Sequence, residues 1–257
     1  MTPAQLPADL TGTDIDRPQE GTFAFRQGPL VHNLILADEI NRAPAKVQSA
    51  LLEAMEERQT SVGDKTYPLD GLFMVMATQN PIEQEGTYPL PEAQMDRFLM
   101  HVQVHYPPVE NEVEVIRLVR GEEQGANAGG GGGETPAAIP QQAVFDARNE
   151  IGQIHVADAM DRYMADLVQA TRAPGVLSED LARWIEIGAS PRGSLALDKC
   201  SRAHAWLRGR DYVDPADVRA IVHDVFRHRI ALSFEAQGDG KTTDQVIDAF
   251  VSLVALP

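Results

Sequence analysis

The sequence predicts two parts of different fold class, an α/β part with a parallel sheet covered by helices on both faces, and an all-helical part after it. In the first part, residues 30–37 and 72–77 are near-continuous apolar runs, which are typical of strands buried on both faces. A Gly-rich stretch at 121–133 follows, and such a sequence cannot bury enough surface to offset its ordering entropy. Beyond it, apolar residues recur at helical spacing without a convincing strand pattern.

Composition limits the size and the partners of these parts. With 257 residues, of which 43% are hydrophobic, the chain can bury one sizeable core and a second, smaller one. The net charge of -16 argues against nucleic acid or an anionic membrane as the primary partner, because both are bound through Lys and Arg. Cys200 is the single cysteine, which excludes an internal disulfide. Since no signal peptide or long apolar run is present, we expect a cytoplasmic chain without membrane insertion.

The first predicted strand, residues 30–37, ends at two acidic residues, Asp38 and Glu39. The segment 41–57 is predicted to be a helix, because Pro44 provides a helix-start signal. Apolar residues also recur there at every fourth position: Val47, Leu51 and Met55. The pattern is that of a strand, a loop and a helix.

Further strands are predicted after this helix. Residues 60–67 form two β-prone arms around a Gly-Asp turn, which indicates a hairpin. The apolar run 72–77 is followed by the polar segment 78–80, and residues 100–106 alternate between faces before a pair of prolines. In open α/β sheets, ligands bind at the carboxyl ends of the strands. We therefore expect the polar residues that follow the two apolar runs to line a site.

Asp38 and Glu39 have two interpretations. They can simply cap the following helix, since short acidic pairs after apolar runs are common. Alternatively, they are the acidic pair that P-loop NTPases carry at the end of a buried strand. In that case Asp38 holds Mg²⁺ through water, and Glu39 polarises the attacking water as a base.

Asn80 and Arg97 also have two interpretations each. Asn80 is either a turn residue before a proline or a group that orients the attacking water and senses the γ-phosphate. Arg97 is either a surface residue paired with Asp96 or an arginine finger that projects into a neighbouring subunit. The residues alone leave both choices open.

A phosphate-binding loop of the form GxxxxGK[ST] is missing from the 257 residues. Gly240, Lys241 and Thr242 end such a motif correctly, but Glu235 stands where its first glycine is needed. We expect an exposed turn at this place. The chain therefore carries the acidic half of an ATP site without the phosphate-cradling half.

The part after the Gly-rich stretch is predicted to be a helical bundle, because its apolar residues repeat on one face of each segment. Cys200 is expected to pack rather than to react, and the scattered histidines give no persuasive metal site. The expected helices span residues 140–155, 157–171, 177–187, 191–208, 215–229 and 243–256.

Three strings of this sequence resemble the MoxR group of AAA+ ATPases: residues 36–44, residues 46–55 and, most specifically, residues 77–98. The likeness extends to the C-terminal helices and includes the segment 188–193 before a long helix. A chance match over this length is negligible. The resemblance implies a partial AAA+ P-loop NTPase core, with its first strand missing, followed by an all-α lid domain.

The resemblance also assigns roles to five residues. Asp38 and Glu39 match the Walker B pair, and Asn80 matches sensor 1. Arg97 matches the arginine finger. Arg192 matches the sensor 2 arginine of the lid, although a residue at that place can equally be a solvated first-turn arginine. The implied cofactors are ATP and Mg²⁺.

The family likeness suggests how the chain is divided and what it assembles with. We expect a partial ATPase core at residues 1–108, a connecting helix with a Gly-rich insert at 109–139, and a helical lid at 140–257. The implied partners are like subunits in a hexameric ring, a protein with a von Willebrand A domain and a client protein complex. Nucleic acid is not an expected partner.

The departures from the family are the Gly-rich insert and, more seriously, the front of the chain. Relatives carry a first strand, the phosphate loop and its helix before the position of Met1. That first strand is central in the AAA+ sheet, and without it two apolar strands expose unpaired edges. We therefore expect that Met1 is not the native start.

Two functional hypotheses follow. In the first, the protein is an ATPase whose hydrolysis moves the lid against the core and so remodels a client protein or loads its cofactor. In the second, it is a non-hydrolysing subunit that lends Arg97 to a neighbour with an intact phosphate loop. An inactive fragment is a third hypothesis, and we expect this chain alone to be inactive as an ATPase because it lacks the phosphate-binding loop.

Overall fold

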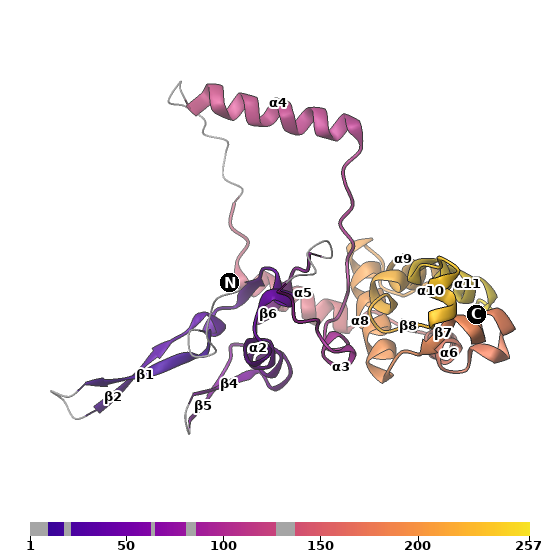
Figure 1. Cartoon of the computed structure of the whole chain (residues 1–257), viewed down its shortest axis with the longest axis horizontal. Helices are drawn as coiled ribbons and strands as arrows, with labels where there is room; N and C mark the ends of the chain where they lie inside the picture. Colours follow the sequence, from indigo (N-terminus) through magenta and orange to yellow (C-terminus); the bar gives the residue numbers. More distant parts are fainter. Residues whose placement is uncertain (1–9, 18–21, 63–64, 81–85, 127–136) are drawn as a thin grey trace. The chain divides into compact units, whose positions relative to one another are not determined.

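A computed structural model describes residues 10–17, 22–62, 65–80, 86–126 and 137–257 (Figure 1). The chain divides into two compact units, Met1–Leu99 and Met100–Pro257, and each is described by itself. The first unit is mixed α/β and the second is almost entirely helical. The change of fold class along the chain therefore agrees with the prediction.

The first unit is built around a parallel pair of strands, β3 (Leu34–Ala37) and β6 (Met74–Ala77). Helix α2 (Ala45–Glu57) packs its apolar residues into the same core as Ile35 and Ala37. This confirms the predicted strand, loop and helix. The opposite face of the strand pair is apolar and exposed, at Leu34, Leu36, Met74 and Met76.

Two antiparallel hairpins belong to the same unit. One joins β4 (Gln59–Val62) to β5 (Lys65–Pro68) and confirms the predicted hairpin, although its expected turn at 63–64 lies outside the described residues. The other joins β1 (Gly12–Arg17) to β2 (Thr22–Gln27) and was not predicted (Figure 1).

Two strand predictions in and after this unit need correction. The strand expected at 30–37 starts later, because Pro29 begins a short 3-10 helix, η1 (Pro29–Val31). The strand expected at 100–106 is absent: within the described residues this segment pairs with no other strand. The backbone N–H of His101 donates instead to Asp224 O at 2.7 Å, and Val104 and Tyr106 are strongly exposed. An alternating pattern forms a strand only where a neighbour completes the ladder.

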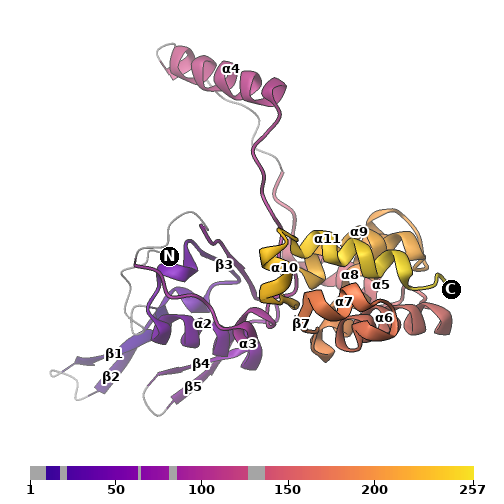
Figure 2. The same cartoon turned by 45° about the vertical axis from the view of Figure 1, so that its right-hand side comes forward.

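The second unit is a helical bundle (Figure 2). Its core is filled by large side chains that are almost wholly inaccessible, among them Tyr163, Leu197, Phe226 and Phe250. The helices of the bundle are α5 (Gln141–Gly152), α6 (Asp158–Arg172), α7 (Glu179–Trp184), α8 (Pro191–Leu207), α9 (Pro215–Phe226), α10 (Phe234–Gly238) and α11 (Thr243–Leu253), with the 3-10 turn η3 (Pro174–Val176). Helix α4 (Val109–Ala126) precedes the bundle, and none of its described residues belongs to the bundle core. In the first unit, the 3-10 turn η2 (Ile40–Arg42) follows Glu39.

The helix predicted at 177–187 is too long. Helix α7 ends at Trp184, and the chain continues as β7 (Ile185–Ile187), which pairs antiparallel with β8 (Ala231–Leu232). The expectation that no strand follows the Gly-rich stretch is therefore wrong at this point. The end of the segment, Ile185–Ile187, reads Ile-Glu-Ile, and so short a pattern fits a strand as well as a helix, while its pairing partner lies far away in the sequence.

Local sequence explains where α9 and α11 begin. Asp214 and Asp217 form a reciprocal capping box at α9, with Pro215 in the first helical position. Thr242 and Gln245 form the corresponding box at α11. Thr242 thus belongs to a helix cap.

Within the described residues, no helix combines the length and the apolar character needed to cross a membrane. The run of glycines at 129–133 lies outside the described residues.

Candidate functional site

The parallel register of β3 and β6 places the residues after the two strands next to each other. Ala37 lies opposite Ala77, so Asp38 and Thr78 follow at the same level. The backbone continues the ladder beyond the strands, since Thr78 N donates to Ala37 O and Ile40 N donates to Thr78 O, both at 3.0 Å. The carboxyl edge of the strand pair is therefore ordered by backbone bonds.

The Thr78 hydroxyl joins the two acidic residues. It donates to Asp38 Oδ1 at 2.6 Å and accepts the backbone N–H of Glu39 at 2.8 Å. Sequence reasoning expected the polar residues 78–80 to line a site but gave Thr78 no task of its own. The available signal was its position directly after the second apolar run, matching that of Asp38 after the first.

Glu39 has a left-handed backbone, with φ 50° and ψ 52°. This conformation is uncommon for a residue with a side chain and costs on the order of 1–3 kcal/mol, so it persists only where the surroundings impose it. The bonds to Thr78 and the 3-10 turn η2 that follows impose it here. The Glu39 carboxylate pairs with Arg42 at 3.2 Å, and the two side chains are 30% and 35% exposed to solvent.

Asn80 lies two residues after Thr78 and is partly buried. The segment that returns past this region is held by Gln48 of α2, which is 2% exposed. Gln48 Nε2 donates to Ile40 O at 3.1 Å and to Tyr88 O at 3.0 Å, so one buried amide fixes the turn after Glu39 to the later segment. The sequence placed Gln48 within the family-like string without suggesting this task.

Arg97 follows the short helix α3 (Glu92–Met95) and is partly exposed. Its Nη2 lies 2.8 Å from Oε2 of Glu56, near the end of α2. The ordinary surface pairing considered for this arginine was with Asp96, whereas the ion pair formed in the structure reaches Glu56. One edge of the guanidinium is therefore held by a carboxylate of the same unit.

Arg192 belongs to the second unit, in the first turn of α8. The Ser190 side chain caps this helix by accepting the backbone N–H of Arg192 at 3.0 Å. Gly193, one residue later, is buried, and a Cβ there would lie 3.2 Å from Ala189 Cβ. The backbone around Arg192 is thus fixed by a cap and by close packing.

The turn before Arg192 is held against the end of α6. Thr171 Oγ1 accepts the N–H of Ala189 at 2.9 Å, and Arg172 Nε donates to Ala189 O at 2.8 Å. Gly188 approaches so closely that a Cβ would lie 2.3 Å from Thr171 O. Close contacts therefore explain why glycines occupy positions 188 and 193.

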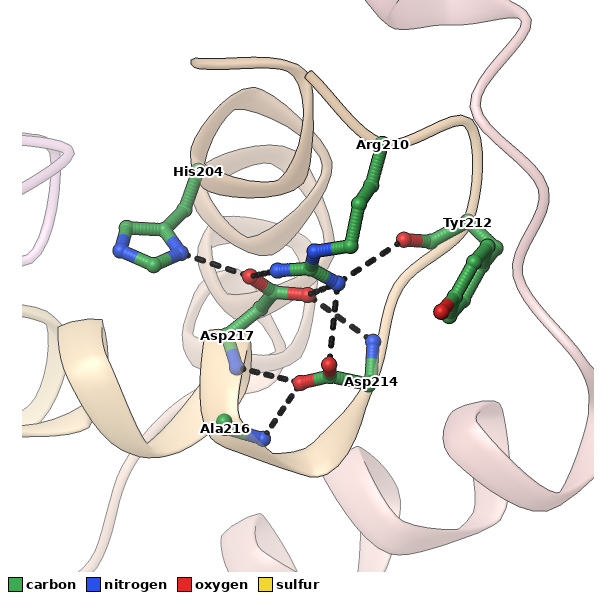
Figure 3. A network of polar contacts seen from close by, with 6 residues as sticks. All are labelled: His204, Arg210, Tyr212, Asp214, Ala216 and Asp217. Atoms are coloured by element: carbon green, nitrogen blue, oxygen red, sulfur yellow. Dashed lines mark hydrogen bonds and ion pairs between the residues drawn. The ribbon is translucent and has the colours of Figure 1, made fainter. Parts of the chain in front are cut away.

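A second polar cluster lies between α8 and α9 (Figure 3). Arg210 forms a forked pair with Asp217 and a further bond from Nη1 to Asp214 Oδ2 at 3.0 Å. His204 Nδ1 lies 2.7 Å from Asp217 Oδ1. Burial alone raises the pKa of Asp217, but the bonds from Arg210, from the Asp214 amide and from His204 outweigh burial and hold that pKa below its ordinary value. This cluster fastens the two helices, and the sequence gave no sign of it.

The structure brings together some of the predicted site residues and not others. Asn80 lies two residues after Thr78, on the segment that follows β6. Asp38 and Glu39 are brought together through Thr78. Arg97 lies in the same unit but pairs with Glu56, and Arg192 belongs to the other unit. Within the described residues, no set of three or more His, Cys, Asp or Glu side chains forms a metal-binding group.

These residues fit the metal part of Mg·ATP better than its phosphate part. Asp38 is exposed at the strand edge, and a single carboxylate with water is a usual protein contribution to Mg²⁺ bound with phosphates. A phosphate cradle is lacking, because no GxxxxGK[ST] occurs in the sequence. Lys241, which ends the nearest approach to that motif, lies over the Trp184 ring at 4.6 Å beside the cap of α11.

Family models match both parts of the chain. The ATPase family associated with various cellular activities (AAA) matches residues 1–100, and an AAA lid domain matches residues 179–250. The first match contains Asp38, Glu39, Asn80 and Arg97, and the second contains Arg192.

Several known proteins are similar to the whole chain. Chaperone MoxR1 of Mycobacterium tuberculosis is 44% identical, over 100% of this chain and 66% of its own length. The uncharacterised protein YeaC of Bacillus subtilis is 40% identical, over 100% of this chain and 76% of its own length. Protein MoxR of Paracoccus denitrificans is 34% identical, over 98% and 77%. The crystal structure of a candidate ATPase from Cytophaga hutchinsonii superposes with a TM-score of 0.85 at 42% identity, covering 100% of this chain and 76% of that one.

Proposed function

The chain belongs to the MoxR family of AAA+ ATPases, and from that premise we propose that it supplies the metal-and-water side of an ATP-hydrolysing site in a chaperone-like machine. The observation that carries the proposal is the arrangement of Asp38, Thr78 and Glu39 beyond the carboxyl ends of two parallel strands. Mg²⁺ bound with ATP at this edge would neutralise phosphate charge, with Asp38 holding the ion through water.

Each proposed residue has its own task in this site. Glu39 polarises the attacking water as a general base, a role that its place beside an exposed Asp38 supports. Asn80 orients the same water through its amide. Arg192 contributes positive charge from the lid, and the tight packing of the segment 188–193 supports a fixed place for it.

Arg97 acts on a neighbouring subunit in this proposal. The site requires a ring of like subunits, which we propose to be a hexamer, because an arginine finger serves the nucleotide of the adjacent subunit. The pair with Glu56 supports such a role, since it engages Nη2 and orients a planar guanidinium that carries further N–H donors able to bind a phosphate.

A second candidate function is favoured by the lack of GxxxxGK[ST] in the 257 residues, since the nearest approach to that motif places Lys241 over the Trp184 ring and Thr242 in the cap of α11. In this function the chain does not hydrolyse ATP and donates Arg97 to a subunit that carries an intact phosphate loop. The two functions share the same arginine finger and differ in whether Glu39 works on a nucleotide.

We assign the core to residues 1–108, the connecting helix and Gly-rich insert to 109–139, and the lid to 140–257. Movement of the lid against the core would remodel a client protein complex or load its cofactor. By family likeness, the partner that recruits the client carries a von Willebrand A domain, and the work takes place in the cytoplasm. The net charge of -16 argues against nucleic acid as the client.

The first function is tested with Glu39→Gln in the gene product, tagged at its C-terminus and expressed from its own locus. ATP should still bind, while turnover should fall by about 10² to 10⁴, the usual contribution of a general base. Glu57→Gln, a change of an exposed carboxylate at the end of α2, is the matched control. Unchanged hydrolysis in the Glu39→Gln variant would rule out the assignment.

The second function is tested by mixing this chain with a MoxR-family protein that contains GxxxxGK[ST]. The chain should raise ATP turnover of that protein, and Arg97→Ala should abolish the increase, which reaches about 10³ to 10⁵ where arginine fingers operate. Arg162→Ala, at an exposed helix position, is the control. If the wild-type chain gives no stimulation in mixed assemblies, this function is excluded.

A further inference from the structure

We propose that Thr78 is a positioning residue for the Asp38 and Glu39 pair, and this proposal rests on the function proposed above. One hydroxyl group fixes two things at once, the carboxylate of Asp38 and the backbone of Glu39. Thr78 itself is not assigned any contact with nucleotide or metal. It acts through the two acidic residues.

The strand register explains why position 78 is suited to this task. Parallel pairing sets Ala37 opposite Ala77, so the side chain of Thr78, the residue after β6, lies beside that of Asp38. The hydroxyl is a single donor with lone pairs to spare. Its hydrogen goes to Asp38 Oδ1 at 2.6 Å, and its oxygen accepts the Glu39 N–H at 2.8 Å. The direction of both bonds is therefore settled by chemistry, since a carboxylate can only accept and an amide N–H can only donate.

The bond to Asp38 determines which oxygen faces outward. Because Oδ1 receives the Thr78 hydroxyl, the exposed carboxylate is held in one orientation and Oδ2 remains for metal-bound water. Groups that orient a metal-binding carboxylate in this way raise the affinity of the site for the metal ion, although they do not touch the ion. A Thr78 variant without the hydroxyl should therefore weaken the response to Mg²⁺.

The bond to Glu39 stabilises an unfavourable backbone. With φ 50°, Glu39 lies in the left-handed region, which reverses the chain and directs the next residues into η2. The N–H of Glu39 would otherwise point to solvent at the strand edge, and the Thr78 oxygen gives it a partner within the protein. Loss of this bond should loosen the Glu39 backbone while leaving the Ile40 N–H bond to Thr78 O in place.

A purely structural role, in which Thr78 only closes the end of the strand, predicts a different result. It would change stability without changing the dependence of the reaction on Mg²⁺. The decisive comparison is Thr78→Val, which keeps the shape and removes the hydroxyl, against Thr78→Ser, which keeps the hydroxyl. Thr66→Val, on the exposed hairpin strand β5, is the control for a threonine-to-valine change in this unit.

The first measurement is amide hydrogen exchange of the 257-residue chain. Thr78→Val should reduce protection of the Glu39 amide by at least about tenfold, while the Ile40 amide serves as the internal control. Thr78→Ser and Thr66→Val should leave both amides as in the wild type. Unchanged protection of Glu39 in Thr78→Val would overturn the proposal.

The second measurement is ATP turnover against Mg²⁺ concentration in the gene product expressed from its own locus. Thr78→Val should need about 10-fold to 100-fold more Mg²⁺ for half-maximal turnover, with recovery at high Mg²⁺ and with near wild-type behaviour in Thr78→Ser. An unchanged Mg²⁺ requirement in Thr78→Val would overturn the positioning role. Absence of hydrolysis in the wild type would instead refute the proposed ATPase function, and the exchange of the Glu39 amide would still decide whether Thr78 holds that backbone.

Discussion

Single residues decide the geometry around each proposed catalytic group. Thr78 holds Asp38 and Glu39 in the first unit through one hydroxyl. In the second unit, Gly188 allows the turn before Arg192 to lie directly against the backbone of Thr171. In both places the residue that fixes the geometry is small and carries no charge, and the charged residue depends on it.

Gly188→Ala should therefore destabilise the second unit. The added Cβ would lie 2.3 Å from Thr171 O and 2.9 Å from Arg172 N, and backbone atoms can yield only by moving the turn. Overpacking of this kind costs about 1–3 kcal/mol, measurable by urea or thermal unfolding. Gly121→Ala in α4 is the control, because nothing lies within 4 Å of its added Cβ. Equal effects of the two substitutions would contradict this explanation.

Cys200 should react slowly with thiol reagents. It is buried in the helical core, and burial raises the pKa of its thiol to about 11, so almost none is ionised near pH 8. The rate of modification by a chromogenic disulfide should be at least about 100-fold lower in the native chain than in the urea-unfolded chain. A comparable rate in both states would contradict a packing role for Cys200.

At the scale of elements, the helices of the second unit are joined by polar clusters as well as by apolar packing. Asp217 caps α9 and binds Arg210 and His204, so it links the start of α9 to the end of α8 (Figure 3). Arg227 binds Asp224 of its own helix and Asp244 of α11 in a similar way. The bond from His204 to Asp217 holds the end of α8, the helix at whose first turn Arg192 lies.

Acid should weaken the link made by Asp217. Its pKa is lowered in the folded state, so its contribution to stability is complete above the unfolded value of about 3.9 and is lost as the pH falls through the lower folded pKa. Asp217→Asn should thus lower the unfolding midpoint at pH 6, and its deficit relative to the wild type should shrink below pH 4. The control is Asp166→Asn, which removes an exposed pair with Arg162. A deficit that does not vary with pH would contradict the assignment.

At the scale of the whole molecule, local patterns predicted the elements better than their pairing. The helix at 41–57 and the hairpin at 60–67 were predicted because periodicity and turn residues are encoded locally. The strand at 100–106 was wrong, since a strand also needs a neighbour that its own residues do not specify. The helix predicted at 177–187 is too long for the same reason. Its last residues form β7 by pairing with β8, which is distant in the sequence.

For the candidate site, too, the sequence predicted the residues but not the contacts between them. Asp38, Glu39, Asn80, Arg97 and Arg192 could be named from the sequence because they follow apolar runs or match family strings. The contacts that hold the acidic pair, Arg97 and the turn before Arg192 come from residues far away in the chain: Thr78, Glu56 and Thr171. Such contacts arise from strand register and helix packing, which a single sequence does not reveal.

The most direct test of the ATPase assignment is a cryo-electron microscopy structure of the Glu39→Gln gene product, expressed from its own locus and incubated with ATP and Mg²⁺. We predict a ring in which Asp38 lies within one water molecule of Mg²⁺ and Arg97 of each subunit reaches the phosphates bound next to it. A ring in which nucleotide and metal lie away from Asp38 would contradict the central claim.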